Sequence, residues 1–130
     1  MALMFPSKKK SGFSETTLWT NSSPTSSFSG DITVSNISGY DYIKIYFRYS
    51  TSLNETSEAI FPWTIFYNEY CGFGMRKSSS TSINDMKYRC CYAKSYTTLN
   101  FANSVSHQSA SQTTSGAYII PTKITGLKFT

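Results

Sequence analysis

Residues 40–50, YDYIKIYFRYS, alternate between two kinds of side chain. The odd positions carry apolar side chains: Ile43, Ile45, Phe47 and Tyr49. The even positions carry rings with hydroxyls and cations: Tyr42, Lys44, Tyr46 and Arg48. Because successive side chains of a strand point to opposite faces, this period of two predicts a strand with one buried face and one solvated face. Such strands are typical of antiparallel sheets.

Similar but shorter patterns recur along the chain. Aromatic residues make up 16% of the 130 residues and charged residues only 15%, a composition that favours strands over surface helices. Turn signals recur roughly every ten residues, which indicates about seven to nine short strands and no convincing helix. The sequence therefore predicts one all-β domain, residues 16–130, folded as an antiparallel β-sandwich or a jelly-roll-like barrel. The expected strands are 16–20, 31–37, 40–50, 59–70, 84–96 and 97–106, with one or two more in 117–130.

Residues 1–15 predict a short, flexible and basic N-terminal arm with Lys8, Lys9 and Lys10 in a row. From residue 14 onward, nine basic and seven acidic residues leave a charge of only +2 out of the total of +5. Such an arm suits an acidic partner surface, an anionic surface or nucleic acid, or it is a solvated tail. The start does not resemble a secretory signal, and no apolar run is long enough to span a membrane.

The three cysteines do not predict a metal site, because Cys71, Cys90 and Cys91 include no paired C-x-x-C spacing. If Cys90 and Cys91 lie in a strand, they point to opposite faces, and only one of them can face Cys71. We expect buried free thiols that act as small apolar side chains.

No set of residues predicts catalysis. The single histidine, His107, lies in a polar segment without the context of an activated serine. Glu55 and Glu58 lie close together but in an expected loop, and the other acids fall mostly at turns and strand ends. The segment 72–77, GFGMRK, lacks the following helix that a phosphate loop needs. We therefore expect no enzyme, no cofactor and no metal.

One candidate contact face stands out. It comprises the even positions of the alternating strand, Tyr42, Lys44, Tyr46 and Arg48, extended by Tyr88 and Tyr92 with Lys87 and Arg89 among them. Rings and cations of this kind are favoured at protein interfaces. They also stack on sugars or bases, or they form the second buried face of a sandwich. A subunit or partner interface is the preferred interpretation, and nucleic acid the least favoured.

Three motifs add a family resemblance: LWTNSSPTSSFSG at 18–30, SGYD at 38–41 and IPTKITGLKF at 120–129. Together they resemble a small β-sandwich module of structural and tail-associated proteins in phages that infect Gram-positive bacteria. The similarity covers residues 16–48 and 118–129.

The resemblance implies a β-sandwich carried on the virion, without enzymatic activity. It implies that Trp19 anchors the first strand in the core, that the polar loop around Pro24 crosses the end of the sandwich, and that the first and last strands lie close together. Since little besides residues 1–15 is left for attachment, we expect an accessory protein that decorates or completes a capsid or tail. Its expected partners are other virion proteins and further copies of itself, with a trimer favoured. The alternative is a module at a tail tip or fibre that adheres to host-surface glycans.

Overall fold

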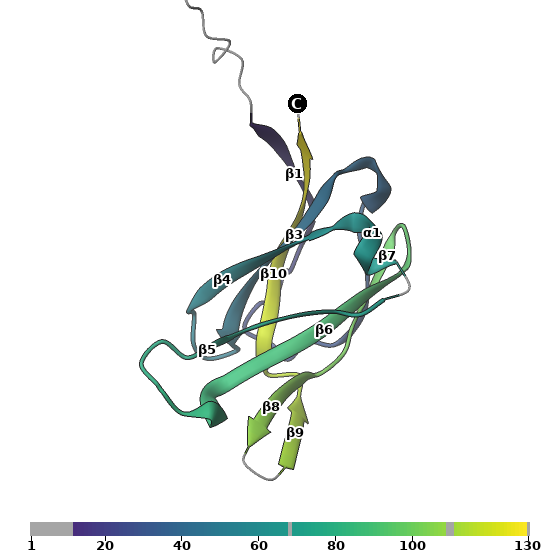
Figure 1. The fold of residues 1–130 in the computed structure, drawn as a ribbon. Coiled ribbons are helices and arrows are strands. Elements are labelled where there is room, and N and C mark those ends of the chain that lie inside the picture. Colours follow the sequence, from purple (N-terminus) through teal and green to yellow (C-terminus); the bar gives the residue numbers. More distant parts are fainter. Residues whose placement is uncertain (1–11, 68, 109–110, 130) are drawn as a thin grey trace, which may run out of the picture.

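The computed structural model of the chain describes residues 12–67, 69–108 and 111–129. These residues form two antiparallel sheets that pack together as a β-sandwich, which confirms the predicted fold class (Figure 1). The strands are β1 (Phe13–Thr20), β2 (Gly30–Thr33), β3 (Tyr42–Ser50), β4 (Thr56–Pro62), β5 (Cys71–Arg76), β6 (Met86–Ser95), β7 (Thr98–Phe101), β8 (Ser104–Gln108), β9 (Ser111–Ser115) and β10 (Tyr118–Phe129). The short helical turns are η2 (Ile37–Gly39), α1 (Trp63–Phe66) and η3 (Ile83–Asp85). None of the described helices is long and apolar enough to cross a membrane.

The first sheet has the order β1-β10-β3-β4. The first and last strands pair antiparallel, from Phe13 opposite Phe129 to Thr20 opposite Lys123, which confirms that these strands lie close together. In the second sheet, β6 is central: β5 pairs with one edge, and β7 and β8 share the other. Strand β2 lies beyond β7, and β9 lies beyond β8.

The core lies between the sheets, and β3 supplies it as the alternation predicts. Ile43, Ile45 and Phe47 are buried, whereas the even positions of β3 are half-buried on the outer face. From the second sheet, Phe73 and Phe101 meet them: the ring centroids of Phe47 and Phe73 are 5.1 Å apart, and those of Phe73 and Phe101 are 6.3 Å apart. The aromatic rings therefore join the two layers.

The cysteines follow the prediction from strand geometry. Cys71 lies directly opposite Cys91 in the pairing of β5 with β6, and both are buried, while Cys90 lies on the other face of β6. All three are free thiols. Burial raises the pKa of Cys71 to about 11 and that of Cys91 well above its ordinary value, so both thiols stay protonated at neutral pH.

Several predicted strand boundaries are wrong. The expected strand 59–70 ends at Pro62, because proline has no N–H to donate to the ladder, and the chain then makes the single turn α1 that buries Phe66. Strand β2 stops at Thr33 and η2 follows, capped by the Asn36 side chain, which accepts a 2.8 Å hydrogen bond from the Ser38 N–H. The expected strand 97–106 is divided into β7 and β8, and the polar segment after it contributes to the hairpin of β8 and β9.

The boundary of the N-terminal arm also moves. Strand β1 begins at Phe13, because its backbone pairs with Phe129 and the two rings meet edge to face with centroids 6.2 Å apart. Residues 13–15 therefore belong to the sandwich and not to the arm. Lys8, Lys9 and Lys10 lie outside the described residues.

The polar loop between β1 and β2 leads from one sheet to the other, as expected. Asn21 fixes its start: the backbone N–H donates to the Thr122 carbonyl and the side-chain amide donates to the Pro121 carbonyl, both at 2.9 Å. Phe28 fixes its end, donating its N–H to the Gly116 carbonyl at 2.8 Å. Trp19 is only partly buried and packs on Phe28, while its neighbour in β1, Leu18, takes the buried position.

The motifs near the two ends of the chain interlock. The ring of Tyr40 lies so close to Gly126 that any Cβ at this glycine would fall within 3.0 Å of ring carbons. Asp41 donates its N–H to the Leu127 carbonyl at 2.9 Å, and its carboxylate accepts the Phe129 N–H at 2.8 Å. The SGYD motif and the final strand therefore form one structural unit.

Candidate functional site

The outer face of the first sheet holds the predicted residues of β3 in a polar network. Tyr46 donates its hydroxyl proton to the carboxylate of Glu15 on β1, which also accepts a 2.7 Å hydrogen bond from the Thr125 hydroxyl on β10. The ammonium groups of Lys44 and Lys123 lie over the Tyr46 ring, 4.7 and 4.5 Å from its centroid. Lys44 also pairs with Glu58 on β4 at 3.2 Å. The network thus links all four strands of this sheet.

Mutual contacts set the protonation of this network. The hydrogen bond from Tyr46, followed by that from Thr125, holds the pKa of Glu15 below its ordinary value. The same bond to Glu15 raises the pKa of Tyr46, and the contact with Tyr46 raises the pKa of Lys44. These groups are therefore locked in their neutral-pH states. Their charges and hydrogen bonds are directed toward each other, and Arg48 is likewise engaged, since its Nε donates to the Ser50 carbonyl at 2.8 Å.

The predicted extension of this face onto Tyr88 and Tyr92 is wrong. Both residues lie on β6, which belongs to the second sheet, and their side chains point away from the shared core, out of the opposite side of the sandwich. Lys87 and Arg89 alternate with them and are therefore buried. The structure brings together Tyr42, Lys44, Tyr46 and Arg48 on one face and places the other two tyrosines on another.

Arg89 is fully buried, and its guanidinium donates hydrogen bonds to five backbone carbonyls. Within the described part of the chain, the ion pairs involve Lys44 and Lys94, not Arg89. Burial lowers the pKa of Arg89 to about 10, so the group stays charged at neutral pH. The accepting carbonyls, at 2.6–3.4 Å, are those of Phe28, Ala102, Gly116, Tyr118 and Ile119.

These bonds explain how the polar loop of the LWTNSSPTSSFSG motif is held. Arg89 joins the last aromatic residue of this motif, Phe28, to the first residues of β10. Among these, Ile119 has a φ of 50°, a left-handed conformation that a β-branched residue rarely adopts. Arg89 Nε bonds the Ile119 carbonyl at 2.8 Å, so the buried cation stabilises a strained backbone. Its role is architectural.

Lys87 and Ser106 form a second buried polar pair. The Lys87 ammonium donates to the Ser106 hydroxyl at 2.7 Å and lies 4.3 Å from the ring centroid of Tyr118. Burial lowers the pKa of Lys87. A serine beside a lysine of lowered pKa has the groups of a nucleophile and its base. However, Lys87 is only 7% and Ser106 only 4% exposed, so substrate cannot approach them, and the pair ties β6 to β8 instead.

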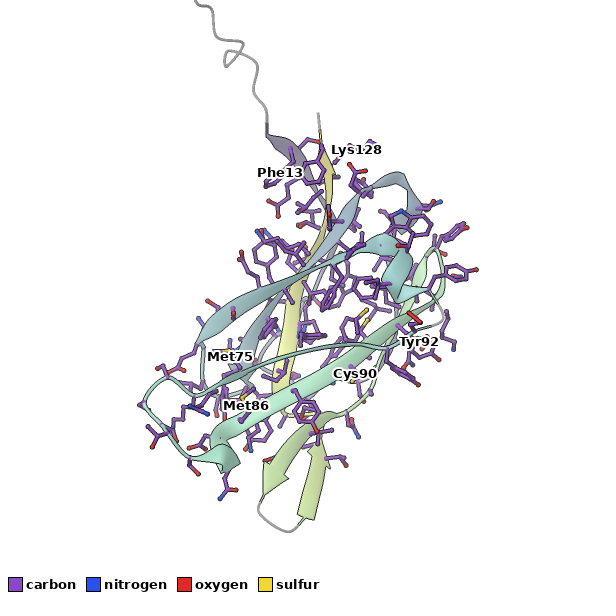
Figure 2. The ribbon with its side chains drawn as sticks, viewed as in Figure 1. Phe13, Met75, Met86, Cys90, Tyr92 and Lys128 are labelled. Carbon is purple, nitrogen blue, oxygen red and sulfur yellow. The ribbon has the colours of Figure 1, made fainter. Side chains whose placement is uncertain are left out.

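The outer face of the second sheet carries a mixed aromatic and polar row. Tyr70 and Tyr92 meet edge to face with centroids 4.8 Å apart. Across the strands, Tyr92 lies opposite Asn100 on β7, which lies opposite Asp31 on β2. Asp31 accepts hydrogen bonds from the Asn100 amide at 2.7 Å and from Lys94 at 2.8 Å. Figure 2 shows Tyr92 toward one end of β6, with Met86 at the other.

A group of aromatic side chains borders this row around α1. The Tyr96 ring contacts Trp63, with centroids 5.7 Å apart, and Tyr67, with centroids 5.2 Å apart. Tyr96 and Tyr67 are 44% and 37% exposed. The sequence pattern did not predict this group, because residues 59–70 were expected to form one strand. The sequence signal for the break is Pro62, at which β4 ends and after which α1 begins.

A third surface lies where both ends of the sandwich domain emerge. Phe129 packs edge to face between Phe13 and Tyr42, with centroids 6.2 and 5.4 Å away. Phe13 and Phe129 are still 49% and 53% exposed. Figure 2 shows Phe13 and Lys128 together at the projecting ends of β1 and β10. We call Phe13, Tyr42 and Phe129 the terminal aromatic cluster.

The other side chains considered for catalysis or metal binding do not come together in one site within the part of the chain that the structure describes. No group of three or more His, Cys, Asp and Glu side chains is placed to hold a metal ion among the described residues. Glu55 is used structurally: its carboxylate accepts the N–H and hydroxyl of Ser78 at 2.8 and 2.7 Å. His107 lies in β8 opposite Gln112, in a strand rather than the expected loop.

In comparisons with known proteins, the sequence matches no protein-family model and no curated protein.

Proposed function

We propose that this chain is an accessory structural protein of a bacteriophage virion that docks onto a capsid or tail through its N-terminal end. The observation that carries the proposal is the terminal aromatic cluster. About half of each of the Phe13 and Phe129 side chains remains open although the two rings contact each other. The family resemblance of the terminal motifs supports the virion context.

The charge of the arm agrees with this attachment. Lys8, Lys9 and Lys10 precede the cluster by only a few residues in the sequence. A partner surface with an apolar groove and an acidic rim would contact both features at once. Aromatic residues are enriched in the cores of protein interfaces, and complementary charges at the rim increase the association rate.

A structural role explains the contacts of the side chains that an enzyme would use for catalysis. Lys87 donates a hydrogen bond to Ser106 across strands, and Arg89 donates to backbone carbonyls. Three carboxylates accept hydrogen bonds within the fold: Glu15, Asp31 and Glu55. Virion proteins act in many copies, so we also propose a homo-oligomer, preferably a trimer. The surface proposed for contacts between copies is the outer face of the first sheet, where the charged side chains pair with one another.

The test is incorporation into phage particles. A phage whose own gene is disrupted receives the chain in trans as wild type, as a deletion of residues 1–11 that spares β1, or as Phe13→Ser with Phe129→Ser. We expect wild type in purified particles, and at least about tenfold less of either variant. Ile65→Ser is the matched control, because Ile65 is an apolar side chain that is 39% exposed on α1, outside the terminal aromatic cluster and the outer face of the first sheet.

Two results would contradict the proposal. One is absence of the wild-type chain from purified particles, measured by quantitative mass spectrometry. The other is undiminished incorporation of both the deletion and the double variant. Circular dichroism of each purified variant checks that the sandwich is folded, so that reduced incorporation reports docking.

A further inference from the structure

We infer that the outer face of the second sheet holds a binding site for a short neutral oligosaccharide, formed by Tyr70, Tyr92, Asn100, Asp31 and Lys94. We call these residues the Tyr92 row. The inference is independent of the virion attachment proposed above, because it uses the other sheet and no residue of the terminal aromatic cluster.

The aromatic half of the row offers open ring surface. Tyr70 is 66% exposed, and its edge-to-face contact with Tyr92 holds the two rings at an angle of 64°. A hexose has an apolar face of C–H groups that packs on such a ring, while the phenol hydroxyls stay available to water or sugar hydroxyls. Two rings set at an angle favour a curved, three-dimensional ligand over a flat one.

The polar half of the row lies beside the rings at a suitable spacing. Tyr92, Asn100 and Asp31 are directly opposed on neighbouring strands, so the row extends about 10 Å from Tyr92 to Asp31. This length suits an oligosaccharide of a few units. Asn100 and Lys94 are fixed by their hydrogen bonds to Asp31, so little side-chain entropy remains to be lost when a sugar hydroxyl binds.

The charges of the row favour a neutral ligand. The Lys94 ammonium and the Asp31 carboxylate pair at 2.8 Å and balance each other. The Asn100 amide, followed by Lys94, holds the pKa of Asp31 below its ordinary value, and Asp31 raises the pKa of Lys94, so both stay ionised at neutral pH. An acidic sugar would meet the Asp31 carboxylate, and a basic one would meet Lys94.

The outer face of the first sheet differs in how its central ring is used. There Tyr46 donates its hydroxyl to Glu15, and the ammonium groups of Lys44 and Lys123 lie over its ring, so its ring and its polar group are already occupied. This difference identifies the second sheet as the sugar-binding face.

The test uses the isolated 130-residue chain and defined sugars. Maltotriose, cellotriose and triacetylchitotriose, with sialyllactose as the acidic comparison, are titrated into the ¹⁵N-labelled protein, and backbone amide shifts are followed by NMR. We expect at least one neutral trisaccharide to bind with a dissociation constant on the order of 1 mM, shifting signals of residues 31, 70, 92, 94 and 100.

Substitutions then assign the binding. Tyr92→Ala should weaken the affinity at least about tenfold, whereas Tyr92→Phe, which keeps the ring, should stay within about threefold of wild type. Tyr42→Ala is the matched control: Tyr42 is also half-buried and also makes an edge-to-face ring contact, but on the other sheet. Dispersed amide spectra establish that each variant is folded.

Several results would overturn the inference. They are the absence of shifts with all three neutral sugars, shifts that map to the first sheet, tighter binding of sialyllactose, or unchanged binding by Tyr92→Ala. Self-association that depends on Tyr92, without sugar binding, would assign the row to a protein contact instead. Failure of these titrations leaves the particle assay unaffected, so the two proposals fail separately.

Discussion

Strands β3 and β6 are built from similar residues, and the sandwich uses them in opposite ways. Strand β3 reads YIKIYFRYS and β6 reads MKYRCCYAKS, so each interleaves tyrosines with lysine and arginine. In β3 the tyrosines and cations at positions 42, 44, 46 and 48 share one face and form a surface network. In β6 the tyrosines face outward, while Lys87 and Arg89 are buried.

The cause of this difference is a shift of one residue. The cations of β3 occupy the same parity as Tyr42 and Tyr46, whereas Lys87 and Arg89 of β6 occupy the opposite parity to Tyr88 and Tyr92, and only Lys94 near the end of β6 shares the outward parity. Because side chains alternate between faces, parity alone buries Lys87 and Arg89 while Tyr88 and Tyr92 face outward. The comparison teaches that a strand of alternating tyrosines and cations does not by itself predict a surface patch. The prediction also needs to establish which of the two alternating positions faces the core.

The energetic consequences also differ. A half-buried cation on the outer face keeps part of its hydration, so its contacts contribute little. A buried cation must replace its water with acceptors, and Arg89 does so with backbone carbonyls from three separate stretches of chain. The inner cations should therefore dominate stability, and the outer groups should dominate only the response to pH.

The largest expected effect comes from Arg89→Met. This change removes the donors and leaves several buried carbonyls unsatisfied, so we expect a loss of about 3 kcal/mol or more in the free energy of unfolding. Arg89→Lys should recover only part of it, because an ammonium cannot reproduce the planar fork. Urea denaturation monitored by tryptophan fluorescence measures both.

Arg48→Met is the matched change on β3. Arg48 is half-buried and makes one 2.8 Å bond to the Ser50 carbonyl, so we expect a loss below about 1 kcal/mol. Similar losses for Arg48→Met and Arg89→Met would break the comparison between the two strands.

An intermediate effect is expected for Lys87→Ala. The change removes a buried stem, the 2.7 Å bond to Ser106 and the contact with the Tyr118 ring, which together suggest a loss of about 1–3 kcal/mol. Lys44→Ala removes a surface ion pair and should cost about 1 kcal/mol or less. Thermal unfolding of both variants ranks them, and a larger loss for Lys44→Ala would reverse the proposed order.

The smallest expected effect is on the stability of the fold at acidic pH. Since hydrogen bonds from Tyr46 and Thr125 lower the pKa of Glu15 from 4.5, the folded chain holds this proton less tightly than the unfolded chain. The resulting stabilisation is complete above pH 4.5 and is lost as the pH falls through the folded pKa. Solvent screening limits it to below about 1 kcal/mol.

Glu15→Gln should therefore show a shallower loss of stability than wild type between about pH 6 and pH 3. Tyr46→Phe should shift the profile in the same direction, because Tyr46 is the main cause of the lowered pKa. Urea midpoints measured across this range test both variants. Profiles parallel to that of wild type would show that the network does not control Glu15.

Local pattern was sufficient for much of the fold. The alternation in β3 and the opposite faces of Cys90 and Cys91 were correctly predicted from it, whereas the closeness of the first and last strands was predicted only from the family resemblance. Prediction failed where a local signal was outweighed: Pro62 ended a run of apolar residues, and Phe13 joined β1 because Phe129 lies opposite it. The α1 aromatic group was missed for the first of these reasons.

The sequence by itself determined the class of the fold, since its period of two, its composition and its turn residues all depend on neighbours along the chain. Only the tertiary structure decided which surfaces exist. It placed β3 and β6 in different sheets, buried Arg89 with hydrogen bonds to the carbonyls of Phe28 and Tyr118, and aligned Tyr92, Asn100 and Asp31 across three strands. These arrangements depend on which strands pair and in which register, and both follow from the packing of the whole core rather than from any single segment.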